Sequence, residues 1–395
     1  MERIIMHIDV NNAFLSWTAT DLLEKGYKLD IRTIESIIAK DPTKRTSLVL
    51  AKSPLAKKKG IKTAETIYEA KRKCPNLKIY KPNYQMYQEK SSKLFNLIKI
   101  YTPDIEIASI DECYIDYTKV KNLYKEEKIF AENLKNQIKK ELGFTVNIGI
   151  ANNKLCAKMA SDFEKPDKIH TLYQNEIKEK MYPLPIEELF TVGKKTSEKL
   201  KELGIKKIKD LATANEYNLR KIFKNQAKYL IEIANGIDNE EVKTEKHIPK
   251  GISNEITLEK DITSKQEIKK VLKTLSEMLS KRIQKEEKYA QVICLVLKNS
   301  NFKRYSHQKK LKNPINSYEE IYTSAQELLN KYYKEEKIRL VGLRLDNLKT
   351  KKNYQTSLFE QNKEPDKIET LIKKINQKYG KNILKRASFI ENDKK

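Results

Sequence analysis

The sequence predicts an α+β protein built from several domains. Three observations lead to this prediction. Helix and strand patterns alternate through the first 165 residues, residues 183–236 are helical throughout, and residues 252–347 mix both patterns again. Such changes along a chain of 395 residues favour a series of packed domains over one uniform fold.

The first 165 residues carry apolar residues at the two periods expected of strands and helices. Strands are expected at residues 4–10, 47–51 and 145–150, with a hairpin at residues 105–117. Helices are expected at residues 12–25, 83–101 and 121–142, and after Asn152 or Asn153, either of which would cap a helix ending near Phe163. This part of the chain should therefore form a layered α+β domain.

The rest of the chain divides at a polar segment. Short helices are expected up to about residue 236, and the lysine- and glutamate-rich residues 237–250 are typical of a linker. Beyond it, residues 290–297 and 338–345 read as strands. A polar tail starts at residue 349 and carries a last amphipathic helix over residues 366–378.

The chain is strongly basic, with 80 Lys and Arg against 54 Asp and Glu and a net charge of +26. Such an excess favours a polyanionic partner, because cationic surface displaces counterions from phosphates. An AT-rich genome would account for the choice of lysine over arginine, but less well for the net excess. No run of 18 apolar residues exists, and the first residues carry no signal-peptide pattern. We therefore expect a cytoplasmic protein with no membrane partner.

Acidic residues interrupt two apolar strands. Asp9 ends the first, and Asp111 and Glu112 lie in the hairpin. A carboxylate among apolar residues is costly unless it is paired or bound to a metal, and oxygen ligands suit Mg²⁺. Two such ions would activate an oxygen nucleophile and stabilise a leaving phosphate. The alternative is that each acid simply faces water, and neighbouring acids in a regular strand point to opposite faces.

Three motifs in this order resemble the Y-family DNA polymerases, the bacterial UmuC/DinB-like group: IDVNNAF at residues 8–14, SIDECYID at 109–116 and GIANNKLCAK at 149–158. The resemblance covers roughly residues 1–350. It implies a right-hand polymerase that copies damaged DNA at low fidelity, in DNA repair and the SOS response. The implied domains are a palm (1–15 and 78–168), fingers (16–77), a helix-hairpin-helix thumb (169–236), a linker (237–250), an α/β little finger (251–348) and a tail (349–395).

The resemblance also implies an active site. Asp9, Asp111 and Glu112 would be catalytic and would hold two Mg²⁺, with Mn²⁺ as a substitute and the Val10 carbonyl as a further ligand. The primer hydroxyl would attack the α-phosphate of a dNTP. Nucleotide contacts would come from Ala13 and Phe14 at the sugar and from Lys165 at the triphosphate. A core role for Phe14 is the alternative.

The fingers depart from the family pattern, which has a tyrosine and an arginine three residues apart. Pro54 and Lys57 stand at these positions. Lys57 offers a point charge but no bidentate fork, and Lys52 or Ser53 would have to compensate. Nucleotide affinity is therefore the property most affected.

The segment LFTVGKKTSEKL at residues 189–200 resembles a helix-hairpin-helix, which offers backbone N–H groups to a DNA phosphate. Thr191 stands where the family often has glycine. The DNA contacts implied in the thumb are Gly193, Lys194, Lys195 and Thr196. Candidate phosphate contacts in the little finger are Lys298, Lys303, Arg304, Arg339 and Arg344, for which a solvated charged face is the alternative.

The tail contains QTSLF at residues 355–359, which looks like the sliding-clamp-binding pentapeptide of bacterial polymerases. Gln355 would anchor to backbone, and Leu358 and Phe359 would fill a pocket. Clamp tethering would raise the effective concentration of the primer end.

Two other functions remain open on the residues alone. One is a DNA-binding accessory protein with weakened catalysis, which the Pro54 and Lys57 departure would favour. The other is a two-metal nuclease. A polymerase would bind primer-template DNA and dNTPs, would act as a monomer with a sliding clamp, and would be open to accessory proteins.

Overall fold

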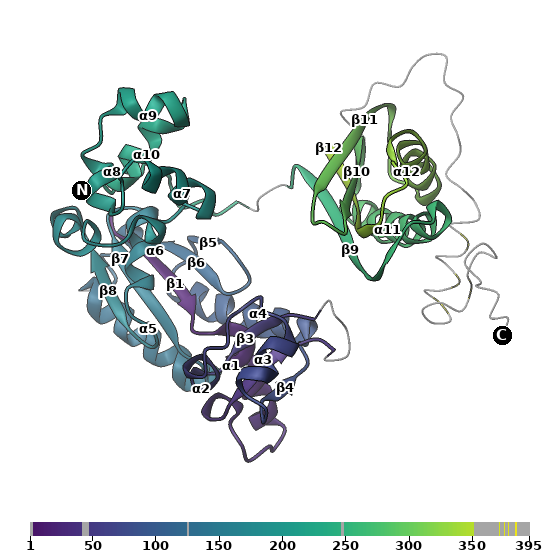
Figure 1. Ribbon diagram of the computed structural model, residues 1–395. Helices are drawn as coiled ribbons and strands as arrows, with labels where there is room; N and C mark the ends of the chain where they lie inside the picture. Colours follow the sequence, from purple (N-terminus) through teal and green to yellow (C-terminus); the bar gives the residue numbers. More distant parts are fainter. Residues whose placement is uncertain are drawn as a thin grey trace. The chain divides into compact units, whose positions relative to one another are not determined.

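The computed structural model describes residues 3–41, 47–124, 126–245 and 249–350, with isolated positions at 371, 375, 378 and 384. The chain forms two compact units, Met1–Ile248 and Pro249–Lys395 (Figure 1). The predicted clamp-binding motif and most of the predicted terminal helix lie outside the described residues. The described residues include no helix that is both long and apolar enough to cross a membrane.

A five-stranded sheet forms the centre of the first unit, in the order β5-β6-β1-β7-β8. The central strand β1 pairs antiparallel with both β6 and β7. The strands span β1 (Ile5–Val10), β5 (Ile105–Ile107), β6 (Glu112–Asp116), β7 (Val146–Ala151) and β8 (Ile169–Leu172). The β5–β6 pair is the predicted hairpin.

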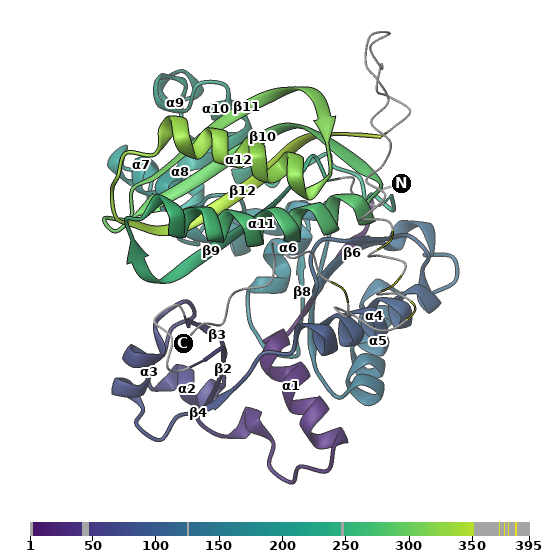
Figure 2. The same cartoon turned by 90° about the vertical axis from the view of Figure 1, so that its right-hand side faces the viewer.

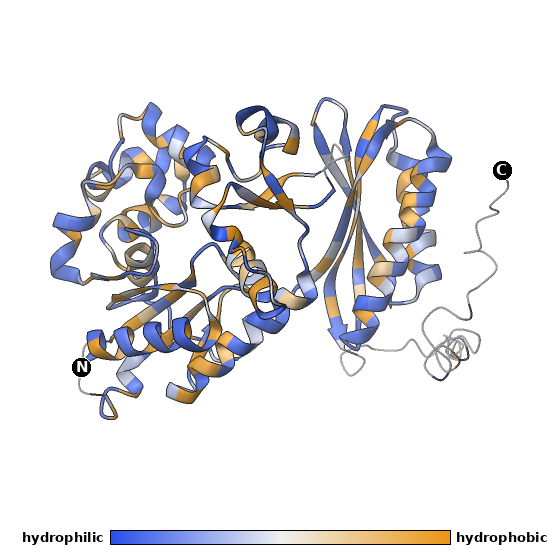
Figure 3. Ribbon diagram, turned by 90° about the horizontal axis from the view of Figure 1, so that it is seen from below, coloured by the Kyte–Doolittle hydropathy of each residue, from blue (hydrophilic) through white to orange (hydrophobic). Residues whose placement is uncertain are grey.

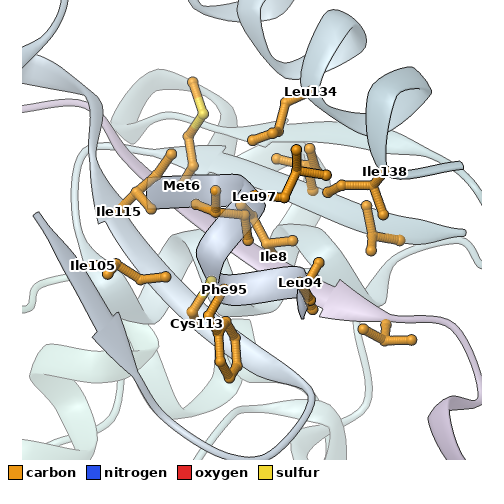
Figure 4. Packing of buried hydrophobic residues seen from close by; sticks show 14 of the residues in the cluster. Met6, Ile8, Leu94, Phe95, Leu97, Ile105, Cys113, Ile115, Leu134 and Ile138 are labelled. Atoms are coloured by element: carbon orange, nitrogen blue, oxygen red, sulfur yellow. The ribbon is translucent and has the colours of Figure 1, made fainter. Parts of the chain in front are cut away.

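Alternation along β1 assigns its side chains to two faces. Met6, Ile8 and Val10 enter the core beneath helices α4 (Tyr84–Tyr101) and α5 (Glu127–Leu142), as Figure 4 shows for Met6 and Ile8. Ile5 packs on the other face, with helix α6 (Lys154–Asp162). His7 and Asp9 share the face of Ile5 and therefore lie on the α6 side.

Helix α6 approaches the sheet closely. A Cβ added at Gly149 of β7 would lie 2.0 Å from the carbonyl oxygen of Ala157, so only glycine allows this distance. The helix begins as predicted at Asn153, whose Oδ1 accepts the N–H of Cys156 at 2.8 Å. Charged side chains of α6 are thereby brought against the sheet.

A smaller sheet, β3-β2-β4, follows helix α1 (Ala13–Glu24). Its strands and helices enclose a separate small core. The elements are β2 (Ser36–Ala39), β3 (Val49–Lys52), β4 (Lys78–Tyr80), α2 (Pro54–Lys58) and α3 (Ile67–Lys73).

Short helices complete the first unit and share a core with α6. They are α7 (Lys194–Glu202), α8 (Ile208–Ala212), α9 (Glu216–Phe223) and α10 (Gln226–Ala234). The helical pattern predicted for residues 183–236 is therefore present.

The first half of the predicted linker is attached to the first unit rather than free. Asp238 accepts the N–H of Leu155 at 3.1 Å, and the backbone N–H of Lys243 donates to Glu106 at 2.7 Å. Glu240 pairs with Lys154 at 3.3 Å. Asp238 and Glu240, acidic residues of the polar segment that we expected to be a linker, therefore bind it to α6.

The second unit is a four-stranded antiparallel sheet, β11-β10-β12-β9, with helices α11 (Lys265–Lys285) and α12 (Tyr318–Tyr332) packed side by side on one face (Figure 2). Hydrophobic and hydrophilic residues alternate along its long strands (Figure 3). The strands are β9 (Gly251–Ile262), β10 (Lys288–Asn299), β11 (Arg304–Ile315) and β12 (Ile338–Thr350). No described helix of this unit packs on the opposite face, which we call the open face.

Candidate active site

The three acidic residues of the two apolar strands come together at the end of β1. Asp9 and Glu112 are direct partners in the β1–β6 register. Asp111 lies in the bend before β6, and its carbonyl accepts the N–H of Val10 at 3.1 Å. Because Asp111 precedes the regular strand, the alternation of strand side chains does not separate it from its neighbour.

The pKa of Asp111 is raised by burial, and also because two other carboxylates lie near it. Burial raises its pKa, the hydroxyl of Ser109 at 2.6 Å partly opposes this, and the charges of Asp9 and Glu112 raise the pKa further. Three carboxylates near one another require cations, and the structure supplies two from lysines.

Lys158 of α6 bridges two of the acids. Its Nζ lies 3.2 Å from Asp9 Oδ2 and 3.2 Å from Glu112 Oε1, and its side chain is 10% exposed. Burial alone would lower its pKa, but the attraction of Asp9, Asp162 and Glu112 outweighs it and raises the pKa. We did not predict Lys158 as a site residue. Its signal was a lysine placed between the small and apolar residues Cys156, Ala157, Met159 and Ala160 of α6.

Lys165, predicted as a triphosphate contact, also reaches the acids. Its Nζ lies 2.6 Å from Asp9 Oδ2 and 2.8 Å from Asp162 Oδ1. Burial opposes its charge, and the two carboxylates raise its pKa despite it. Asp9 is thus contacted by two ammonium groups at once.

A polar network holds the turn that carries Lys165. Asn11 Oδ1 accepts the N–H of Asp167 at 2.9 Å, and Asn147 Nδ2 donates to the Glu164 carbonyl at 2.6 Å. Asn11 and Asn147 are themselves joined at 2.9 Å. Buried amides with satisfied partners fix the turn against the sheet.

His7 is a second residue that we did not predict. Its ring is fully buried, with Nδ1 at 2.8 Å from the Ser161 hydroxyl and Nε2 at 3.5 Å from Glu112 Oε2. Burial lowers the pKa of His7, whereas interaction with His7 and then Lys158 lowers the pKa of Glu112 to about 2. Glu112 is therefore held as a carboxylate.

Phe14, the second residue of α1, lies in an aromatic cluster with Trp17, Tyr84 and Tyr87. It is half-buried and stacks on Tyr87, with ring centroids 4.6 Å apart and planes at 6°. Ala13 is buried at the start of α1, and Asn12 before it has φ 51° and donates to the Lys52 carbonyl at 2.7 Å. The ring has both a packed face and an exposed part.

Ser53 and Pro54 form the start of α2. The Ser53 hydroxyl is fully buried and accepts the N–H groups of Ala56 at 3.1 Å and Ser36 at 3.2 Å, while Pro54 occupies the first helical turn. Ser53 is thus occupied as a helix cap, and the Lys52 ammonium donates to the Thr63 hydroxyl at 2.8 Å. Lys57 is exposed, and burial and then the charge of Lys57 lower the pKa of Lys52.

The predicted helix-hairpin-helix turn precedes α7. Gly193 is the residue before the helix, and Lys194 and Lys195 are exposed, whereas Thr196 is half-buried. Thr191 has φ 77°, in the region that favours glycine. Thr191 thus adopts the positive-φ conformation that glycine, often found at this position in the family, adopts without strain.

Three arginines were predicted to contact DNA in the second unit; Arg304 pairs with Glu255, and the other two also have acidic partners. Arg339 pairs with Asp261 at 3.2 Å and Arg344 with Asp346 at 2.6 Å. Neither is a free cation, which the sequence could not reveal.

Comparison with known proteins identifies the family of this chain. Three family models match: the impB/mucB/samB family over residues 8–162, the IMS family HHH motif over 174–205, and the impB/mucB/samB family C-terminal domain over 249–358. A DNA polymerase IV of Clostridium acetobutylicum is 44% identical over 398 residues, with all of both chains covered. One of Oceanobacillus iheyensis is 33% identical, covering 97% of this chain and 91% of the relative.

Among solved structures, a Y-family DNA polymerase chimera is similar with a TM-score of 0.76 at 26% identity, covering 88% of this chain and 99% of that one. The fold is therefore that of a Y-family DNA polymerase, as the motifs predicted.

The chain belongs to the impB/mucB/samB family. It is a DNA-directed DNA polymerase of the translesion class, and the comparisons give no support to the accessory-protein alternative.

Proposed function

We propose that Asp9, Asp111 and Glu112 are the catalytic carboxylates of this polymerase. The observation that carries the proposal is the register of β1 and β6, which sets Asp9 opposite Glu112 with Asp111 beside them. Reaction at this point would join a dNTP to the primer 3′-hydroxyl.

The donor set suits Mg²⁺. Mg²⁺ prefers oxygen ligands, and in such sites a few carboxylates and the phosphates of the substrate supply them. No group of three acidic, histidine or cysteine side chains among the described residues is already gathered as a metal cage, and Lys158 lies between two of the acids. Asp9, Asp111, Glu112 and the Val10 carbonyl would hold two Mg²⁺, or Mn²⁺ in their place. The ions would lower the pKa of the primer hydroxyl and stabilise the negative charge of the leaving group.

The chain's own residues would position the nucleotide. Lys165 and Lys57 would contact the triphosphate as point charges, and Lys158 would neutralise charge between the acids. The Phe14 ring, with Ala13 before it, would lie under the sugar and leave no space for a 2′-hydroxyl. Its stacking on Tyr87 would make this surface rigid.

DNA would be held on both units. In the thumb, the N–H groups after Gly193, with Lys194, Lys195 and Thr196, would contact a phosphate. In the second unit, Arg339 and Arg344 would have to exchange a carboxylate for a phosphate. Gln355, Leu358 and Phe359 would bind a sliding clamp. We place this monomeric enzyme in the cytoplasm, in the SOS response, with accessory proteins as further partners.

Primer extension tests the catalytic proposal. Wild type should add dNTPs to a short primer-template with Mg²⁺, and the Asp111→Ala/Glu112→Ala double variant should bind the same DNA without extending it. Glu132→Gln, a change of one exposed acid on α5, should extend normally. Extension by the double variant at the wild-type rate would refute the assignment of these carboxylates.

A further inference from the structure

An ion pair crosses the open face of the second unit from one edge of the sheet to the other. Arg304 is the first residue of β11 and Glu255 belongs to β9, the two outer strands of the sheet. The two terminal guanidinium nitrogens of Arg304 donate to the carboxylate, Nη1 to Oε2 at 3.1 Å and Nη2 to Oε1. Since strands β10 and β12 lie between them, the two side chains span about three strand spacings of roughly 4.8 Å each.

A glycine in the sheet makes room for the ion pair of Arg304 and Glu255. Gly342 of β12 is the direct register partner of Glu255, and a Cβ there would meet Glu255 Cγ at 2.8 Å and Val296 Cβ at 3.3 Å. Val296 points away from the helix-covered core, yet it is only 4% exposed. The missing side chain at Gly342 thus leaves a path along which the ion pair lies.

The ion pair of Arg304 and Glu255 is exposed enough for another anion to replace Glu255. The side chains of Arg304 and Glu255 are 53% and 31% exposed. An exposed ion pair contributes little to stability, so a stronger anion can replace one partner. Arginine forms the same bidentate contact with phosphate as with carboxylate. A DNA backbone laid on the open face would therefore compete with Glu255 for the same guanidinium.

We propose that Glu255 is an internal competitor of DNA phosphate for Arg304, and that it weakens the hold of the open face on primer-template DNA. The inference rests on the proposed function, in which the second unit contacts DNA. Glu255 is a positioning residue, acting only through Arg304. It would favour release of DNA after short synthesis.

The test measures DNA affinity of the full chain by fluorescence anisotropy, using a short labelled primer-template over a range of salt concentrations. Glu255→Gln keeps the shape and removes the charge, so the dissociation constant should fall about two- to fivefold, as the loss of an exposed ion pair allows. The dependence of log affinity on log salt should steepen by about 0.9, the value for one additional phosphate contact. Arg304→Gln should weaken binding.

The matched control is Glu277→Gln on α11, which breaks an exposed pair with Lys281 and removes the same charge on the helix side of the sheet. It should leave the salt dependence unchanged. In the Arg304→Gln background, Glu255→Gln should have no further effect. Equal gains from Glu255→Gln and Glu277→Gln, or a gain that persists without Arg304, would overturn the inference by showing a general charge effect.

Loss of affinity in Glu255→Gln would also overturn it, because the pair would then support the binding face. These outcomes are separate from the proposed function. Wild type that extends primers while Glu255→Gln binds like wild type would refute only the inference. Tighter binding by Glu255→Gln without any extension by wild type would support the inference and refute the catalytic assignment.

Discussion

Replacing Lys158 by methionine tests how the carboxylates are held. The change removes an ammonium that lies 3.2 Å from both Asp9 and Glu112 and keeps a side chain of similar length. Two acids of the sheet then lose a shared cation, and the protein should become less stable in metal-free buffer.

The magnitude follows from the contacts that remain. Breaking a buried ion pair by removing one partner costs about 3–5 kcal/mol. Here Asp9 keeps Lys165 at 2.6 Å, and Glu112 is 28% exposed, so solvent and a second cation reduce the cost. We expect a loss of about 2 kcal/mol in the free energy of unfolding, which lowers the transition of a domain of this size by about 4–8 °C.

Thermal unfolding followed by tryptophan fluorescence is the assay. Trp17 is the single tryptophan and is fully buried in the first unit, so the signal reports that unit alone. Mg²⁺ should raise the transition of Lys158→Met more than that of wild type, because the ion replaces the missing charge between the acids.

Lys154→Met is the matched control. Lys154 lies one turn earlier on α6, is equally buried at 10% exposure, and pairs with Glu106 at 2.8 Å and Glu240 at 3.3 Å. Its loss should destabilise the unit without any special response to Mg²⁺. A Lys158→Met variant as stable as wild type, or one whose response to Mg²⁺ matches that of Lys154→Met, would refute the reasoning.

Three further predictions concern single residues. Interaction with His7 above all lowers the pKa of Glu112 from an ordinary 4.5 to about 2, so the ionised carboxylate contributes stability above pH 4.5 that is lost as the pH falls toward 2. In acid denaturation without metal, Glu112→Gln should therefore lose less unfolding free energy than wild type across this window. Equal slopes for the two proteins would contradict the prediction. Thr191→Gly should stabilise the protein by about 0.5–1 kcal/mol in urea unfolding, because glycine adopts the positive φ of this position without strain. The control Thr213→Gly, at φ −102°, should destabilise the protein. Equal effects of the two changes would exclude backbone strain at Thr191. Phe14→Ala should raise ribonucleotide incorporation relative to dNTPs at least tenfold in single-nucleotide extension, and an unchanged ratio would assign the ring to packing alone.

Alternation in β1 could be read from the sequence, and it locates part of the candidate site. Once Met6 and Ile8 are assigned to the core, Asp9 must lie on the other face, and a hairpin at residues 105–117 brings its acids to the neighbouring strand. Strands β1, β5, β6 and β7 and helices α1, α4 and α5 were predicted for the same reason: their apolar periods are strong and local.

Contacts between distant charges were not readable. Lys158 is one of many basic residues, and only the close approach of α6 over Gly149 turns it toward the acids. Arg339 and Arg344 looked free because their acidic partners depend on strand register or on local side-chain geometry. Strands β9 and β11 were missed because edge strands with one open face carry few apolar residues.

Charge balance connects the lysines of this site with the substrate that we propose. Lys158 and Lys165 already neutralise part of the charge on Asp9 and Glu112. When a triphosphate binds, we infer that the Lys165 ammonium would leave Asp9 for a phosphate oxygen, while Lys158 would stay between Asp9 and Glu112. Every buried charge then remains paired during binding, which avoids a desolvation cost of several kcal/mol for each unpaired ion. If Lys165 binds the phosphates as we propose, Lys57 needs to add only a point charge, and the absence of an arginine at this position should slow the enzyme without changing its reaction.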